Sequence, residues 1–357
     1  LWEQAAAQGI TVIVAAGDNG SAGCDDPNSE TVASHGIAVS GIASTPFNVA
    51  VGGTDFNDGT TQTTYFNSTN GTGYLSAKSY IPEMTWNDSC AGGASPSVNS
   101  CTNGTSLKLW SGSGGPSTCS KVTGSTCSGT AKPAWQTGTG VPNDSVRDIP
   151  DISIFAEGGV SASRSFYVLC EADKIPPGYQ SCVQSGGYVD YVPIGGTSAG
   201  APTFAGAVAL ANQKLGKRLG NLNYLLYSIA AQSAASCSTT PSSCVFHDVT
   251  VGANTVPCQG GTPNCSAATG NGVLVDSGKL AYLTGGGYDR ATGLGSPNIT
   301  NLVNAIGAAS FTAMMGMRPW TRMECARLLD EVQRDALLRE SADGADLELL
   351  AALQAEF

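Results

Sequence analysis

The feature that most constrains the fold is an apolar run, ITVIVAA at residues 10–16, that ends in a turn of small residues with one acid, Asp18. A run without polar interruptions is typical of a parallel strand that is buried on both faces. A second run, PFNVAVGGTDF at 46–56, follows the same plan. Open α/β sheets bind their ligands at the carboxyl ends of such strands. The pattern predicts an α/β fold with working groups at that edge of a mostly parallel central sheet flanked by helices.

The remaining core elements are predicted in the second half of the chain. RDIPDISIFA at 147–156 returns to the core, and FYVLC and YVDYVPIGG are typical of strands around a cysteine loop. Residues 196–213 are apolar almost all round, which predicts a buried helix, and a second helix is expected over 222–232.

Two segments are expected to lie outside that core. LWEQAAAQG at the start is typical of the end of a helix that Gly9 stops. Residues 57–145 are dominated by Gly, Ser, Thr, Asn and Cys, so we expect a long, disulfide-pinned excursion on the surface rather than core.

Cysteine usage indicates an oxidising compartment. Ten of the twelve cysteines fall into short-range couples in polar loops: Cys90 with Cys101, Cys119 with Cys127, Cys170 with Cys182, Cys237 with Cys244, and Cys258 with Cys265. Small-loop disulfides of a secreted, extracellular protein are the natural interpretation, although the sequence does not fix their connectivity. Zinc is the alternative, but there are only two histidines and no CxxC. Cys24 and Cys325 are left over.

Charge excludes several classes of partner. The net charge is −11 and the sequence pI is about 4.5, without the basic run that binds nucleic acid or an anionic membrane. No apolar run has transmembrane length. The chain opens on LWEQ with no signal peptide, so we expect a piece whose N-terminal part is missing, and we expect a monomer.

The character of the chain changes after residue 310. Residues 311–357 hold four of the five methionines, many charges and helical periodicity. They could form a regulatory helix pair, an oligomerisation element or a helical tail of unrelated character, and the change of style favours the last. We therefore divide the chain into a main domain at 1–310 and a helical tail at 311–357.

Ser198 is the strongest candidate nucleophile. It follows two glycines and a threonine directly before the predicted helix, so the positive end of the helix dipole lies at its hydroxyl. Small neighbours let a substrate backbone approach closely. The alternative interpretation is an ordinary N-cap serine.

Asp18 and Ser198 together carry a family resemblance. The segment G-T-S-A-x-x-P before a small-residue helix resembles the nucleophile segment of the subtilisin-like superfamily. Ordinary subtilases have Asn in the turn that matches AAGD and His after the proline, whereas this chain has Asp18 and Thr203. In these features the chain resembles the sedolisins, the serine-carboxyl peptidases. FNVAVGGTDF, RDIPDIS, HDVTVG and GGGYDRATGLGSPN resemble further family segments in the family's order, from about residue 10 to 305.

The resemblance implies a subtilisin-like fold and a set of catalytic roles. Ser198 would be the nucleophile, and Asp18 would be a protonated acid that donates a hydrogen bond to the oxyanion. The other interpretation of Asp18 is an Asx-turn or N-cap residue. A carboxyl-based site suits acidic pH, because a histidine base is protonated well below its ordinary pKa of about 6.5.

One part of the family's site is missing. The family has a Glu–Asp pair, four residues apart, on a helix before the turn, but Glu3 is the only acid before Asp18. Glu331 and Asp335 have that spacing but lie after Ser198, and we interpret them as a solvated helix face. The chain alone is therefore expected to be inactive, with the pair and a cleaved pro-segment upstream.

The resemblance also implies a calcium site. Asp248 and Asp289 would supply carboxylate oxygens, and Val249, Gly285 and Gly287 would supply backbone carbonyls, with water completing an all-oxygen shell. His247 and His35 are interpreted as surface loop residues. The expected function is a serine-carboxyl endopeptidase that acts on proteins or peptides. The alternatives are a non-catalytic, calcium-stabilised secreted binding module and an ordinary Ser-His-Asp subtilase, which Asp18 and Thr203 disfavour.

Overall fold

The computed structural model describes residues 1–59, 62–72, 75–118, 121–123, 126–158, 165–170, 192–233 and 243–308. The predicted tail at 311–357 lies outside these residues, and so do Glu331, Asp335 and Cys325. Among the described helices, none combines the length and the apolar character that a membrane crossing requires.

A four-stranded sheet lies at the centre of the molecule and consists of β1 (Ile13–Ala15), β2 (Val49–Phe56), β3 (Glu83–Thr85) and β8 (Ile152–Phe155). β2 pairs in parallel with β1 and with β8, and antiparallel with β3. The predicted parallel arrangement is thus confirmed for three strands, while β3 makes the sheet mixed. β1 is only partly buried, because it pairs with a single strand in the described part of the chain.

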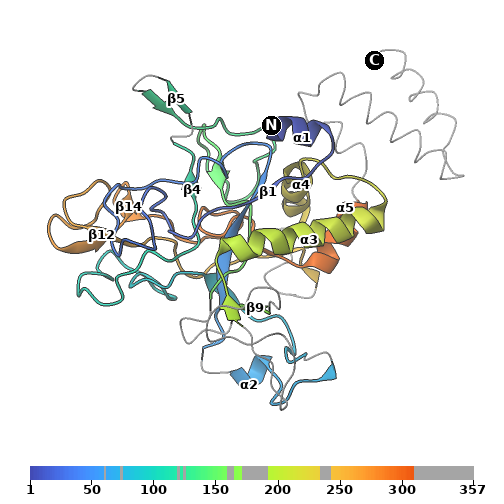
Figure 1. Cartoon of the computed structure of the whole chain (residues 1–357), viewed down its shortest axis with the longest axis horizontal. Coiled ribbons are helices and arrows are strands. Elements are labelled where there is room, and N and C mark those ends of the chain that lie inside the picture. The colour runs from blue at the N-terminus through green and yellow to red at the C-terminus, as the bar shows by residue number, and fades with distance from the viewer. Residues whose placement is uncertain are drawn as a thin grey trace, which may run out of the picture.

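Five helices are described: α1 (Trp2–Ala7), α2 (Gln62–Tyr65), α3 (Thr197–Leu215), α4 (Asn223–Ser233) and α5 (Ile299–Ala308). α3 packs against β1, β2 and β8, and α5 packs against α3 and α4 (Figure 1). The predicted helices at 196–213 and 222–232 are therefore present, with bounds shifted by only a few residues.

Two clusters of apolar side chains lie on opposite faces of β2, as the alternation of a strand requires. Val49 and Val51 belong to the largest core, which α3, α4 and α5 complete with residues such as Phe204 and Leu226. Ala50 belongs to a smaller cluster of loop and strand residues. Helices thus cover one face of the described sheet and loops cover the other.

The prediction that the first of these helices is buried all round is wrong. One face of α3 is buried, through residues that include Ala201, Phe204 and Val208. Ala205 and Leu210 on another face are exposed. The small side chains that made the helix look buried instead let its inner face lie close to the sheet, as at Gly200 beside Val51.

The prediction that residues 57–145 form only a surface excursion is also wrong. This segment contributes β3 to the central sheet, and Trp86, Leu109 and Trp135 are buried. A polar composition hid these residues, because a few large side chains fill the core between turns of Gly, Ser and Asn.

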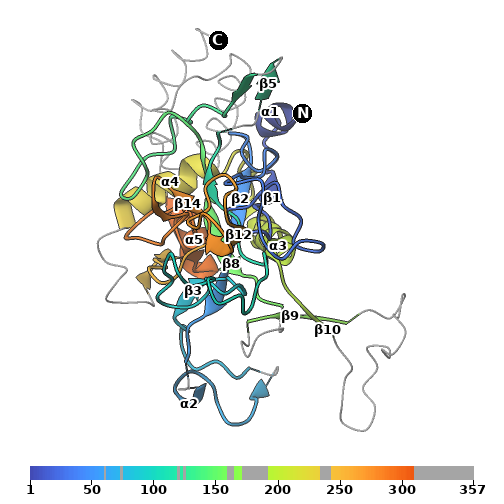
Figure 2. The same ribbon diagram turned by 90° about the vertical axis from the view of Figure 1, so that its left-hand side faces the viewer.

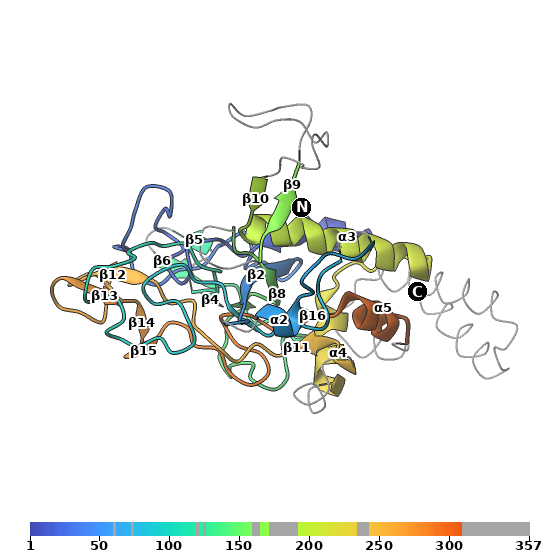
Figure 3. The ribbon, with the colours of Figure 1, turned by 90° about the horizontal axis from the view of Figure 1, so that it is seen from below.

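The other strands form short antiparallel pairs. They are β4 (Gly115–Pro116) with β7 (Asp148–Ile149), β5 (Lys121–Thr123) with β6 (Thr126–Ser128), β9 (Tyr167–Leu169) with β10 (Val192–Ile194), β11 (Phe246–His247) with β16 (Ser296–Pro297), β12 (Pro257–Gln259) with β13 (Asn271–Val273), and β14 (Val275–Asp276) with β15 (Lys279–Leu280). The β9–β10 pair, which the sequence predicts, projects from the body (Figures 2 and 3).

Two of the predicted disulfides lie among the described residues. Cys90 is bonded to Cys101, and Cys258 to Cys265. Cys170 is also disulfide-bonded, but its predicted partner, like Cys119 and Cys237, lies outside the described residues. Cys24 is an exposed free thiol.

Candidate active site

Asp18 lies in a turn that follows β1 at its carboxyl end. Residues 111–113 hold this turn by hydrogen bonds. The amide of Ser111 donates to the Asp18 carbonyl at 3.0 Å, and the amide of Ser113 donates to the Gly17 carbonyl at 3.0 Å. Asn19 donates from its amide to Ser113 Oγ at 3.1 Å. The turn therefore depends on the segment that looked like a surface excursion.

The Asp18 side chain reaches across the molecule to the start of α3. Its Oδ1 accepts hydrogen bonds from the amide and from the Oγ1 of Thr197, both at 2.7 Å. Thr197 Oγ1 in turn accepts from the amide of Gly17 at 3.1 Å. These bonds join residues 179 positions apart and bring the acid next to the residue that directly precedes Ser198.

The second carboxylate oxygen of Asp18, Oδ2, lies close to Gly196. Gly196 has a φ of +84°, which disfavours any residue with a Cβ. A Cβ placed on it would lie 2.6 Å from Asp18 Oδ2. Glycine is thus required twice at this position, for its backbone angle and for the approach of Asp18.

Ser198 is the second residue of α3 and is exposed. The interpretation of Ser198 as an N-cap is wrong, because Gly196 occupies the N-cap position. The Ser198 hydroxyl makes no hydrogen bond with the residues that the structure describes. The cap is instead supplied from a distance by Asp18, which accepts from the amide of Thr197. Asp18 is therefore a capping residue of α3, but not through a local Asx-turn.

The start of α3 also lies against the end of β8. The amide of Gly196 donates to the carbonyl of Ala156, one residue beyond β8, at 2.5 Å. Asp18 thus contacts Thr197, the residue before Ser198, at the carboxyl ends of two parallel strands of the central sheet, where open α/β folds position their chemistry.

Neither histidine is a partner of Ser198. His35 bonds to Asp25 at 2.8 Å. His247 is buried in β11 and stacks on Tyr80, with 3.8 Å between ring centroids. The interpretation of His247 as a surface loop residue is therefore wrong. Both histidines of the chain are described, so no Ser–His pair forms within it.

The predicted calcium residues are brought together around one loop. Gly287 donates from its amide to Asp248 Oδ2 at 3.0 Å, and Gly285 donates to Asp289 Oδ2 at 3.0 Å. Asp289 Oδ1 accepts from the amides of Ala291 and Thr292. Val249 follows Asp248 directly. The two segments that the resemblance paired, near residues 248 and 287, are thus in contact.

The charges of this loop fit a cation. Burial raises the pKa of Asp289 to about 7, and the partial loss of solvent around the more exposed Asp248 also raises its pKa. No Lys or Arg among the described residues forms an ion pair with either carboxylate. A buried carboxylate without a cationic partner is costly, and the donors here are oxygen atoms of the kind that Ca²⁺ prefers.

Two residues with a part in the site were missed from the sequence. Thr197 links Asp18 to α3, and Asn19 fixes the turn to Ser113. The signal for Thr197 was its place in the G-T-S-A segment, directly before the candidate nucleophile. Its hydroxyl can donate one hydrogen bond and accept another. The expected Glu–Asp relay pair is not found before Asp18. The only acid in that stretch is Glu3, which lies in α1.

Comparisons with known proteins give a consistent result. The chain is 27% identical over 308 residues to Kumamolisin from Bacillus sp. (strain MN-32), a match that covers 85% of this chain and 37% of Kumamolisin. It is 33% identical over 165 residues to Tripeptidyl-peptidase 1 from Dictyostelium discoideum, covering 45% of this chain and 19% of that protein. It is 36% identical over 112 residues to Tripeptidyl-peptidase sed4 from Aspergillus fumigatus, covering 30% and 16%. No protein-family model matches.

A solved structure supports the same assignment. Pseudomonas sedolisin, a serine-carboxyl proteinase complexed with two molecules of pseudo-iodotyrostatin, matches with a TM-score of 0.51 and 25% identity, over 87% of this chain and 59% of that chain. The chain spans less than two fifths of the length of each of the three curated relatives. The sequence motifs, the fold and these matches agree, and over most of its length the chain belongs to the sedolisin family.

Proposed function

We propose that the chain carries the nucleophile and the oxyanion acid of a secreted serine-carboxyl endopeptidase that cleaves proteins or peptides at acidic pH. The observation that carries this proposal is the pair of hydrogen bonds from Thr197 to Asp18, which holds the acid beside Ser198. Asp18 in the turn, and Thr203 after the proline where subtilases have His, speak against the subtilase alternative.

The proposed chemistry depends on different roles for the two oxygens of the Asp18 carboxyl group. Ser198 Oγ attacks the scissile carbonyl carbon, and the electron pair of the C=O bond moves to its oxygen. Because Asp18 Oδ1 already accepts two bonds from Thr197, the carboxyl proton belongs on Oδ2, which donates to the developing oxyanion. Collapse of this intermediate breaks the C–N bond and leaves an acyl-enzyme, which water hydrolyses.

The proton of Ser198 needs a base. The family resemblance assigns it to a Glu–Asp pair, which then protonates the leaving amine. No such pair precedes Asp18 in this chain, where Glu3 is the only acid. We propose that sequence preceding Leu1 supplies the pair, and that residues 1–357 alone hydrolyse peptides poorly or not at all.

The proposed calcium ion has a structural part. The ion would be held by the carboxylates of Asp248 and Asp289 and by the carbonyls of Val249, Gly285 and Gly287. It would supply positive charge to the segment between α4 and α5. The support is the contact between the two predicted segments and the burial of Asp289 without a Lys or Arg partner among the described residues.

The test is peptide hydrolysis at about pH 4, where carboxyl-based catalysis works and a histidine base does not. We expect hydrolysis by the chain extended N-terminally with its own encoded sequence, and its loss in Ser198→Ala. Hydrolysis that survives Ser198→Ala would refute the nucleophile assignment. Strong Ser198-dependent cleavage by residues 1–357 alone would instead refute the need for an upstream pair.

The second candidate is the non-catalytic binding module. It predicts that the sequence encoded before Leu1 also lacks an acidic pair. It predicts that the extended protein binds peptide without cleaving it and that a peptide aldehyde forms no adduct with Ser198. An intact-mass shift with the aldehyde in the wild type, absent in Ser198→Ala, decides for the peptidase.

A further inference from the structure

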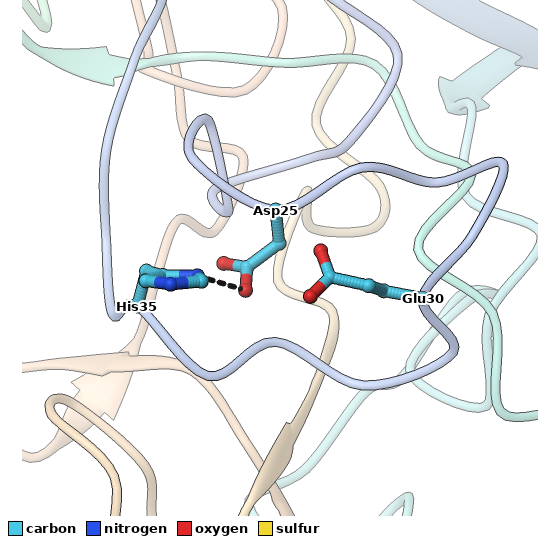
Figure 4. Close-up of side chains that lie close together, drawn as sticks. All are labelled: Asp25, Glu30 and His35. Atoms are coloured by element: carbon cyan, nitrogen blue, oxygen red, sulfur yellow. Dashed lines mark hydrogen bonds and ion pairs between the residues drawn. The ribbon is translucent and has the colours of Figure 1, made fainter.

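Three side chains that commonly bind metal ions gather on the loop after the Asp18 turn. They are Asp25, Glu30 and His35, and one ligand-type atom from each lies within 4.8 Å of the others. Figure 4 shows the Glu30 carboxylate directed at the Asp25 carboxylate, with His35 on the other side of Asp25. The cluster shares no residue with the candidate active site or with the proposed calcium loop.

Only one of the two carboxylate oxygens of Asp25 has hydrogen-bond partners among the described residues. Its side chain is completely buried, and Oδ1 accepts from the Ser34 amide at 2.8 Å and from His35 Nδ1 at 2.8 Å. Its Oδ2 is also buried but has no hydrogen-bond partner in the described part of the chain. A buried carboxylate oxygen without a partner costs free energy. This oxygen therefore calls for a ligand.

Glu30 adds a second negative charge at the same place. Its Oε2 accepts from the Asp26 amide at 2.6 Å, which fixes the carboxylate in its inward position. No Lys or Arg among the described residues pairs with Asp25 or Glu30, so His35 is the one basic group beside them. Two facing carboxylates with so little positive charge favour a bound cation or a shared proton.

Hydrogen bonds from Asn19 hold the loop that carries the cluster. Asn19 Nδ2 donates to the carbonyls of Asp25 at 2.8 Å and of Ala22 at 2.9 Å. The position of Asp25 is therefore fixed before any ligand arrives. The side chain of His35, which is 59% exposed, leaves a path for an ion to enter from solvent.

We propose that Asp25, Glu30 and His35 form a binding site for a divalent first-row transition-metal ion, for which Zn²⁺ is the probe. Imidazole nitrogen suits Zn²⁺ and its neighbours in the series, whereas Ca²⁺ and Mg²⁺ prefer oxygen ligands alone. The site takes one carboxylate oxygen from Asp25 and from Glu30 and a ring nitrogen from His35, and water fills the remaining positions. This ion stabilises the loop next to the Asp18 turn.

The test is calorimetric titration of Zn²⁺ into residues 1–357 near neutral pH, after dialysis against a chelator. We expect one ion per chain, and a loss of affinity of about 100-fold or more in both Glu30→Gln and His35→Gln, since removing even an outer-shell partner costs 10–100-fold. Both side chains are at least partly exposed, so these variants should fold.

Matched variants separate this site from the other possible ligands. Asp26→Asn, next to Asp25 but outside the cluster, and Asp248→Asn, in the proposed calcium loop, should bind Zn²⁺ like the wild type. Cys24→Ser tests the neighbouring free thiol. The proposal is overturned by no binding in the wild type, by unchanged binding in both Glu30→Gln and His35→Gln, or by loss of binding in Cys24→Ser. X-ray absorption of the Zn²⁺-loaded wild type should show imidazole and oxygen ligands without sulfur.

Discussion

At the scale of single residues, Gly196 allows the proposed acid, Asp18, to approach the start of α3 closely. Its φ of +84° and the 2.6 Å approach of Asp18 Oδ2 leave no room for a methyl group. We predict that Gly196→Ala in the extended peptidase lowers kcat by about 10²–10³, the cost of losing one oxyanion donor. Peptide hydrolysis at about pH 4 measures this.

Gly206→Ala is the matched control, since it lies in the same helix and a Cβ there meets nothing within 4 Å. We expect it to keep full activity and to gain up to about 1 kcal/mol of stability, because alanine favours a helix. Equal activity in both variants would mean that Asp18 does not act at the position that Gly196 leaves open.

Glu83 is a second informative residue. Its carboxyl group accepts hydrogen bonds from three hydroxyl groups, those of Thr54, Tyr80 and Ser296. Burial raises its pKa above the ordinary value of 4.5. The folded state then binds more protons than the unfolded state above that pH, so stability falls as the pH rises from about 4.5 toward neutral.

We predict that Glu83→Gln makes the free energy of unfolding less dependent on pH over this range. Gln cannot ionise and can still bond to the hydroxyl groups. Urea denaturation at about pH 4 and about pH 7 measures the change, with the exposed residue Glu3→Gln as the control. A wild-type protein that is more stable at neutral than at acidic pH, with the same slope in Glu83→Gln, would contradict the assignment.

At the scale of elements, one buried ion pair joins several parts of the core. Arg147 Nη2 donates to Asp151 Oδ2 at 2.6 Å, and both side chains are fully buried. Asp151 also accepts from the amide of Ala50 in β2 and from the hydroxyl of Tyr227 in α4. This pair therefore ties the entry of β8 to its neighbouring strand and to a helix.

We predict that Arg147→Met destabilises the fold by about 3–5 kcal/mol, because it leaves Asp151 charged and buried without its partner. Arg218→Met is the surface control, since Arg218 is exposed and its one hydrogen bond to the described residues goes to the carbonyl of Gln8. It should cost about 0.5 kcal/mol or less. Urea denaturation of both variants measures the difference. Equal costs would show that the buried pair contributes no more than a surface contact.

The elements also show what a sequence can predict. The apolar runs predicted β1, β2 and β8, because parallel strands need uninterrupted apolar side chains. The position of β3 was missed, since Glu83 and Thr85 look polar and their hydrogen bonds to distant residues are invisible in the sequence. α3 was predicted as a helix but with too much burial, because alanine and glycine suit both a close packing face and an exposed one.

The candidate site was predictable in its parts and not in its connections. Asp18 and Ser198 carried recognisable motifs, but the bonds of Thr197 that join them depend on the tertiary fold. Asp25, Glu30 and His35 form no motif, because their approach depends on a loop that Asn19 braces. The sequence identifies which residues could react or bind. Contacts between residues 10 or 179 positions apart depend on the tertiary fold.

At the scale of the whole molecule, the proposed calcium ion should stabilise the part of the chain after α4. We predict that excess Ca²⁺ raises the melting temperature of residues 1–357, by an amount equivalent to about 2.7 kcal/mol at 100 times Kd. Asp248→Asn, an exposed position that should fold, removes this increase. Asp276→Asn keeps it, because Asp276 lies outside the set. Calorimetry checks both, and an undiminished increase in Asp248→Asn argues against the site.

The bonds between Thr197 and Asp18 have a consequence for the order of events during synthesis. The turn with Asp18 leaves the ribosome long before α3 exists, and loop closure over so many residues is slow compared with local structure. The acid can reach the start of α3 only after the whole chain between them has been synthesised. The proposed peptidase would therefore have no complete site while the segment from Asp18 to Thr197 is still being synthesised.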